Sequence, residues 1–224
     1  MNQRGARRWL RAAVSLLVLV SVAASVSYFV REPANLGFLD HPTIVGLHVV
    51  LGAVYIAVAP FQFIGRIRNR HRSYHRAAGR VLVTVGTVVG VTALFLGLVI
   101  PFSGWPESVL IAIFGTLFLF FLLRGYAHIR AKRVALHQAS MMRAFAIALA
   151  PATQRVLFIP PLLVLKDPTL DQVILLSVAA WTTALVLHSV LAEVWIRRTR
   201  RSRPQRSSQY AASEAAHIQA GSSR

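Results

Sequence analysis

Residues 65–80 have the sequence GRIRNRHRSYHRAAGR, and this stretch decides the fold of the chain. Six arginines and two histidines stand there between two long apolar runs. A segment so highly charged is costly to place in hydrocarbon, so we expect a loop at a membrane surface. Lys and Arg accumulate in the cytoplasmic loops of membrane proteins, which predicts that this loop lies on the cytoplasmic side.

The composition agrees with a membrane protein. Of the 224 residues 55% are hydrophobic, and the formal net charge is +18. The positive charges occur in bursts between apolar runs of about 20 residues, rather than along one soluble face, which argues against nucleic acid as a partner. The chain has no cysteine. Disulfides, thiolate metal sites, iron–sulfur clusters and covalently attached c-type haem are therefore excluded.

Six apolar runs are long enough to cross a bilayer, which takes about 20 residues of helix. We expect an all-α, polytopic bundle of six transmembrane helices, with spans at about 9–30, 43–64, 81–100, 108–129, 141–165 and 170–195. The first run follows a basic amino terminus and looks like a signal peptide. It is longer than the apolar region of such peptides, about 7–15 residues, so a retained first helix is the expectation and cleavage the alternative.

Charge asymmetry predicts the orientation. The amino terminus, the loops after the second and fourth spans and the tail, with the ends of the adjoining spans, carry 22 of the 25 Lys and Arg residues. We therefore expect both termini in the cytoplasm (N-in, C-in) and a multi-pass protein of the bacterial inner membrane. The expected domains are a basic cytoplasmic amino terminus at 1–8, a membrane domain at 9–196 and a basic, disordered cytoplasmic tail at 197–224.

A polar helix face and an intramembrane charge predict a ligand site within the bundle. His48, Tyr55 and Gln62 are spaced by seven residues, so they share one face of the second span. Arg155 lies inside the fifth span next to Gln154, and a charge at such a depth normally has a partner. At about 1.5 Å per residue, Arg155 lies about 21 Å from the cytoplasmic surface and His48 about 8 Å below the opposite one. The two are therefore expected at similar depth.

Pro151 strengthens this prediction. It cannot donate a hydrogen bond to the carbonyl of Ile147, so we expect a broken fifth helix beside Arg155. A broken helix next to a cation is one way in which membrane proteins build an anion site. The alternative is that Arg155 extends to the surface, or pairs with a loop carboxylate such as Asp40.

The cytoplasmic side holds a second group of candidates. Two arginines stand just before or at the start of spans and are candidate anion-binding residues: Arg80 and Arg143. Four histidines are expected in the same layer: His75, His128, His137 and His188. Each arginine follows one of the histidines by five or six residues, which is a weak internal repeat. Anionic lipid head groups of the inner leaflet suit these arginines, and a solvated or head-group-facing position is the alternative for each histidine.

Several of these residues carry a resemblance to a known family. The matching positions are His48, Gly52, Pro60, Gln62, the box HRAAGR at 75–80, the box HQASMMR at 137–143, Thr153 and Arg155. Over about 41–193 the chain resembles a family of bacterial predicted membrane proteins of unknown function, DUF2306. One departure is Gln138, where the family usually has a basic residue. The resemblance implies a membrane fold and marks six residues for testing, His48, His75, Arg80, His137, Arg143 and Arg155, but it transfers no reaction.

Three classes of function remain open. The first is binding or transport of a small anionic or lipid-like ligand at a site around His48 and Arg155. The second is a redox protein that holds b-type haem or a quinone with the four histidines. The third is a structural or accessory protein without a ligand. Catalytic motifs such as HExxH, GxSxG and a phosphate-binding loop are absent from the sequence, which leaves enzymatic activity undecided. A homodimer is possible, because six spans are few for a carrier.

Overall fold

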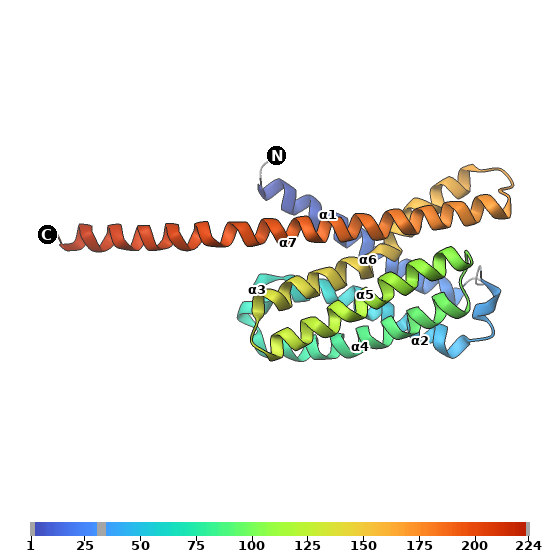
Figure 1. The fold of residues 1–224 in the computed structure, drawn as a ribbon, viewed down its shortest axis with the longest axis horizontal. Helices are drawn as coiled ribbons and strands as arrows, with labels where there is room; N and C mark the ends of the chain where they lie inside the picture. Colours follow the sequence, from blue (N-terminus) through green and yellow to red (C-terminus); the bar gives the residue numbers. More distant parts are fainter. Residues whose placement is uncertain (1–2, 31–34, 223–224) are drawn as a thin grey trace.

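The computed structural model describes residues 3–30 and 35–222 (Figure 1). The described chain is all-α, and six of its helices are long and apolar enough to span a membrane, as predicted. These are α1 (Gln3–Val30), α2 (Pro42–Val58), α4 (Arg72–Val99), α5 (Trp105–Arg130), α6 (Val134–Val164) and α7 (Leu170–Ser222). Three short segments complete the fold: η1 (Leu36–Phe38), η2 (Ala59–Phe63) and α3 (Gly65–Arg70).

The long helices run up and down and pack mostly against their neighbours in the sequence. α2 packs on α4, α4 on α5, α5 on α6 and α6 on α7. α1 contacts both α2 and α6, so α1, α2, α4, α5 and α6 close into a ring and α7 lies on α6 outside it (Figure 1). The core of the ring includes Tyr55, Phe118, Leu122 and Phe145, all nearly inaccessible to solvent.

Glycines of α4 allow α4 and α5 to pack closely. A Cβ added at Gly90 would lie 2.5 Å from Leu119 Cδ2, and one at Gly97 would lie 2.5 Å from Ile111 Cδ1. In lipid, close packing of this kind replaces the hydrophobic effect as the force between helices. The third span therefore carries a packing seam.

The basic segment that was predicted as a loop is mostly helical. Residues 65–70 form α3, and α4 begins at Arg72, nine residues before the expected start of the third span. Arg and Ala are good helix formers, so the helix continues beyond the apolar run. The short break lies at His71, whose φ of −121° and ψ of 62° are not helical. Arg76 and Arg80 consequently lie one turn apart on α4, on the same side of the helix.

The predicted break in the fifth span is also absent, because α6 is continuous from Val134 to Val164 with Pro151, Pro160 and Pro161 inside it. A proline removes one helical hydrogen bond and often bends a helix without ending it. Figure 1 shows the second half of α6 turning away from α5 and staying beside α7.

Both ends of the described chain lie on the same side of the bundle as α3 and the α5–α6 turn, which is the basic end (Figure 1). The cytoplasmic location of this end stays a prediction. So do the domain limits and the disorder predicted for 197–224: α7 continues as helix to Ser222, and 223–224 lie outside the described residues. Parts of the predicted amino terminus and of the first loop, residues 1–2 and 31–34, also lie outside them.

Candidate functional site

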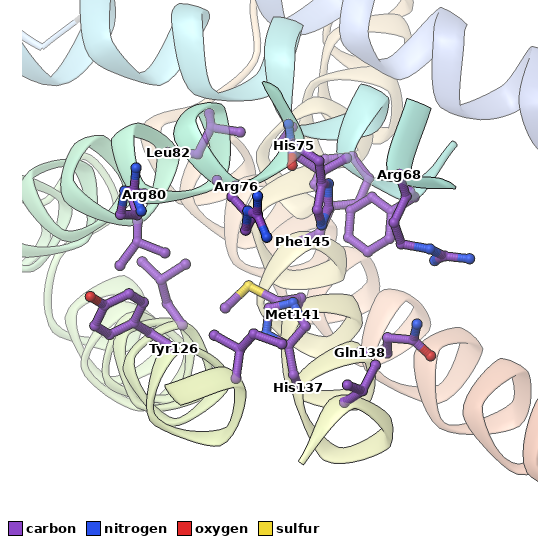
Figure 2. A pocket seen from close by; sticks show the side chains of 18 of the residues that line it. Arg68, His75, Arg76, Arg80, Leu82, Tyr126, His137, Gln138, Met141 and Phe145 are labelled. Atoms are coloured by element: carbon purple, nitrogen blue, oxygen red, sulfur yellow. The ribbon is translucent and has the colours of Figure 1, made fainter. Parts of the chain in front are cut away.

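A cavity of about 470 Å³ lies at the basic end, between η2, α3, α4, α5 and α6. We call it the basic-end cavity. Its polar lining residues are Tyr55, Gln62, Arg68, His75, Arg76, Arg80, Tyr126, Arg130, His137 and Gln138. Most of the remaining wall is apolar and includes Leu82, Val83, Leu122, Met141 and Phe145. Figure 2 shows Arg68, His75 and Arg76 on one side of this cavity and Tyr126, Met141 and His137 on the other.

Polar atoms in this wall lack partners. Both amide atoms of Gln62, Nε2 and Oε1, are buried and make no hydrogen bond within the described part of the chain, and the same holds for Nδ1 of His75. Leaving a buried polar atom unpaired costs about 1–3 kcal/mol, so native structures rarely do it without a reason such as a water or a ligand. Gln62 and His75 are both lining residues of the cavity, so a water or ligand in the cavity is the expected partner for these atoms.

His137 is held in a defined orientation on the opposite wall. Its Nδ1 lies 2.9 Å from the carbonyl oxygen of Gly125. A carbonyl only accepts hydrogen bonds, so Nδ1 carries the hydrogen and the neutral ring keeps the lone pair on Nε2. The α5–α6 contact thus fixes the tautomer of a histidine that lines the cavity.

A second cavity, of about 360 Å³, lies toward the opposite end of the bundle and is lined by α1, α2, α4, α5, α6 and α7. We call it the Arg155 cavity, and it contains both His48 and Arg155. His48 Nδ1 lies 3.2 Å from the carbonyl oxygen of Val89 and 3.0 Å from Thr92 Oγ1. The similar depth that was predicted for His48 and Arg155 agrees with their place in one cavity.

Arg155 has no carboxylate partner among the described residues. Its Nη1 donates to the carbonyl oxygen of Pro151 at 2.8 Å, within its own helix. The alternative pairing with Asp40 does not occur, because the ion pair of the described chain is between Arg143 and Glu193. Arg155 therefore lines the cavity with N–H donors that make no hydrogen bond to the described residues.

Tyr55 lines both cavities. It is 4% exposed, its ring meets the ring of Phe118 edge-on at 5.8 Å, and a Cβ added at Gly86 would lie 2.8 Å from its Cε2. The tightly packed Tyr55 side chain therefore lies between the two cavities, on the helix face that was predicted to point into the bundle.

Two of the predicted site residues lie in neither cavity wall. Arg143 binds Glu193 through Nε and Nη2, with Nη2 at 3.0 Å from Oε2, and its guanidinium lies over the ring of Phe121. That pair ties α6 to α7. Gln154 is buried at 7% exposure but does not line either cavity. Neither side chain is brought together with His48 or Arg80.

The four histidines are also separated. Only His75 and His137 line the basic-end cavity. His128 Nε2 accepts a hydrogen bond from Arg124 Nε at 3.3 Å, and His188 Nε2 lies 2.7 Å from Thr153 Oγ1. Among the described residues no cluster of three or more His, Asp or Glu side chains is placed to hold a metal ion.

Sequence reasoning missed several residues of these sites, among them Arg76, Tyr126 and Glu107. Arg76 precedes Arg80 by one helical turn, a spacing that points to one shared wall only when the segment is taken as helix. Tyr126 lies between Arg124 and His128 at the end of the fourth predicted span and gives no signal of its own. Glu107, which falls between the third and fourth predicted spans, is 7% exposed, accepts a hydrogen bond from the Ser103 amide at 2.6 Å and lines the Arg155 cavity. Its position in the first turn of α5 is the usual place for a capping carboxylate.

Comparison with known proteins adds the family. No curated protein and no solved structure matches the chain. A family model described as "Predicted membrane protein (DUF2306)" matches residues 45–195. This stretch runs from the first turn of α2 into α7 and holds most of both cavity walls. Since the match covers well over half of the chain, this multi-pass membrane protein belongs to the DUF2306 family of predicted membrane proteins.

Proposed function

We propose that this protein binds a small anionic, lipid-like ligand within its helix bundle. The sequence centred such a site on His48 and Arg155, and both do share a cavity. The basic-end cavity supports the proposal better, because it combines several cationic side chains with unpaired buried polar atoms. The head group would lie among the arginines and the apolar part against Leu82, Met141 and Phe145.

The observation that carries this proposal is the unpaired amide of Gln62 beside arginines. A phosphate or carboxylate oxygen would accept from Gln62 Nε2 and from guanidinium groups, which bind such oxygens in a bidentate manner. Arg68, Arg76 and Arg80 reach the cavity from α3 and α4. A lone cation or a neutral sugar would leave this positive wall without a counter-charge.

The size and walls of the cavity suit an amphiphile. Ligand cavities are usually about 300–1,000 Å³, lined mostly by apolar side chains with a few polar groups that fix orientation. The basic-end cavity, at about 470 Å³, has this composition. Anionic lipids of the surrounding leaflet are the nearest source of such molecules, in agreement with the predicted contact to anionic head groups.

The test uses dodecyl phosphate as a probe in a neutral detergent. We expect binding by isothermal titration calorimetry, weakened about tenfold by Arg76→Leu, the effect of losing one charge-assisted contact. Dodecyltrimethylammonium, with the same chain and the opposite charge, is the control ligand. Arg66→Leu is the matched control variant, since Arg66 is an exposed arginine of α3 outside the cavity wall. Equal affinity in the wild type and Arg76→Leu, or equal affinity for the two amphiphiles, contradicts the proposal.

A second candidate, b-type haem or a quinone, is favoured by one observation only. His75 and His137 line the same cavity from facing helices, and the neutral ring of His137 keeps its Nε2 lone pair. Purification with haem supplied, followed by a visible spectrum, tests the haem. A Soret band that His75→Ala and His137→Ala each remove supports it, whereas no Soret band in the wild type excludes it. Ubiquinone binding that survives both variants excludes a histidine-held quinone.

A further inference from the structure

The basic-end cavity and the Arg155 cavity reach toward opposite ends of the bundle. The first includes Arg68 and Arg130, which lie at the basic end. The second includes Ile100, Phe102 and Glu107, which surround the α4–α5 turn at the opposite end. Both reach Tyr55 in the middle of the bundle. Together they extend along almost the whole length of α4, with one buried side chain common to their walls.

We propose that the two cavities are the halves of a path for anionic head groups across the membrane, and that the Tyr55 side chain is the gate between them. This proposal rests on the proposed function for its ligand class, but it adds movement between two sites. The gate is the ring of Tyr55 together with its neighbours Phe118 and Leu122, which lie on α5.

The packing around Tyr55 allows such a gate to open. Within the described residues, the Tyr55 hydroxyl makes no hydrogen bond that would have to break when the ring moves. One side of the ring lies against Gly86, which has no side chain to hold it, and another meets the edge of Phe118. A rotation of Tyr55 therefore costs packing contacts but leaves no new unpaired polar atom in the core.

Cationic side chains lie on both sides of the gate, and one acidic side chain, Glu107, also lines the Arg155 cavity near the α4–α5 turn. On one side Arg76 and Arg80 line the cavity, and on the other Arg155 does so, with a hydrogen bond to Pro151 within its own helix. Arg155 has no carboxylate within ion-pair distance among the described residues. An intramembrane cation of this kind is expensive unless it serves a ligand or a pathway. The path explains why a guanidinium is kept at this depth.

The first experiment measures passage in liposomes with a fluorescent NBD-labelled phosphatidylglycerol and dithionite quenching. We expect the wild type to exceed empty liposomes, and Tyr55→Ala to exceed the wild type by about tenfold or more, as when a barrier loses one aromatic contact. Val54→Ala is the matched control, because Val54 is the preceding residue of α2 and 45% exposed on its outer face. NBD-labelled phosphatidylcholine, which has no net charge, should pass more slowly in every variant.

Two sources of the same head-group chemistry are separated by a second arm. Uptake of radiolabelled inorganic phosphate into the same liposomes reports a free anion, whereas quenching of labelled phosphatidylglycerol reports a lipid. Acceleration of either probe by Tyr55→Ala supports the path. If Tyr55→Ala is folded and passes neither probe faster than the wild type, the path is wrong. Dodecyl phosphate binding that persists in that case preserves the proposed function, while passage without such binding leaves the path and removes the basic-end binding site.

A labelling experiment tests the gate without relying on flux. The chain has no cysteine, so single cysteines can be introduced directly. We expect Tyr55→Cys to react with a membrane-impermeant methanethiosulfonate from either side of the membrane, because each cavity reaches position 55. Val54→Cys should react from neither side. Reaction of Tyr55→Cys from one side only, or from none, overturns the two-sided path.

Discussion

Arg143 and Glu193 are joined by two hydrogen bonds across fifty residues of sequence, one of them 3.0 Å between Nη2 and Oε2. Arg143 lies on α6 and Glu193 on α7, so the pair fastens the outer helix α7 to the ring. The side chains are 26% and 39% exposed, so the pair is neither fully buried nor fully exposed. Its role is to hold helices together, and the candidate ligand site lies on the other side of α6.

Loss of the Arg143–Glu193 pair should lower stability. We expect Arg143→Met to reduce the free energy of unfolding by about 1–3 kcal/mol, between the values for exposed and buried pairs. Thermal unfolding in detergent, with Glu193→Gln to complete a double-mutant cycle, measures it. Arg124→Met is the matched control: Arg124 also lies over a ring, that of Phe120 at 5.3 Å, but has no carboxylate partner among the described residues. Equal losses in the two variants contradict this role of the ion pair.

Gln62→Leu should separate stability from ligand binding. The variant replaces a buried, unpaired amide with an apolar side chain of similar size, so the ligand-free protein should gain about 1 kcal/mol of stability. The same change removes the Nε2 donor and should weaken dodecyl phosphate. Unfolding with and without the probe measures both effects. A loss of stability without the probe would show that the Gln62 amide has a structural partner.

The glycines of α4 should differ sharply from those of α2. Gly97→Leu places a large side chain where even a Cβ would lie 2.5 Å from Ile111, so we expect a loss of about 1–3 kcal/mol from overpacking. Gly46 of α2 has nothing within 4 Å of an added Cβ, and Gly46→Ala should stabilise the helix by about 0.5–1 kcal/mol. Thermal unfolding compares the two. A destabilised Gly46→Ala would indicate that another surface packs against that face of α2.

Arg155→Leu should leave the fold intact and slow the passage of anions. Among the described residues, the Arg155 side chain hydrogen-bonds only within α6, so its removal breaks no hydrogen bond between helices of that part of the chain. Removing a charge from the middle of a span also lowers the insertion cost by about 2.5–3.5 kcal/mol on translocon scales. Expression level and size-exclusion profile report the fold, and dithionite quenching of labelled phosphatidylglycerol reports passage. A variant that fails to insert would make Arg155 a structural residue.

Glu107 lines the Arg155 cavity near the α4–α5 turn, where its negative charge should oppose the entry of anions. Glu107→Gln keeps an oxygen that can accept from the Ser103 amide and removes the negative charge. We expect faster entry of labelled phosphatidylglycerol from that side, by about two- to fivefold, since a charge near a mouth acts on encounter more than on stability. Raising the salt concentration should narrow the difference. A variant as slow as the wild type at low salt would place Glu107 in a purely capping role.

The number of helices could be predicted from the sequence because each span is a long apolar run. The ends of the helices could not be predicted, because hydropathy indicates where the apolar segment begins and not where helical hydrogen bonding stops. For example, α4 begins at Arg72, although the apolar run begins at Val81. For the same reason, the sequence did not identify Arg76 as a site residue. Treating 65–80 as a loop removed the periodicity that places Arg76 and Arg80 on one wall.

The candidate site was predictable where helix geometry alone decides. The spacing of His48 and Tyr55 places both in the wall of one cavity, which Arg155 also lines. Contacts between helices far apart in the sequence were out of reach, because one helix face gives no information on its partner. The hydrogen bonds between Arg143 and Glu193 and between His188 and Thr153 are contacts of this kind, each joining α6 to α7.

The early start of α4 makes the arginine wall stiff. A flexible loop would let each guanidinium group follow the lipid phosphates. A helix instead fixes the distance of Arg76 and Arg80 from the apolar segment of α4 along the helix axis. In a thicker or thinner bilayer, the level of the lipid phosphates would therefore shift relative to the guanidinium groups of Arg76 and Arg80. The length of the lipid acyl chains should therefore change the contact between the phosphates and these arginines, independently of the head-group chemistry.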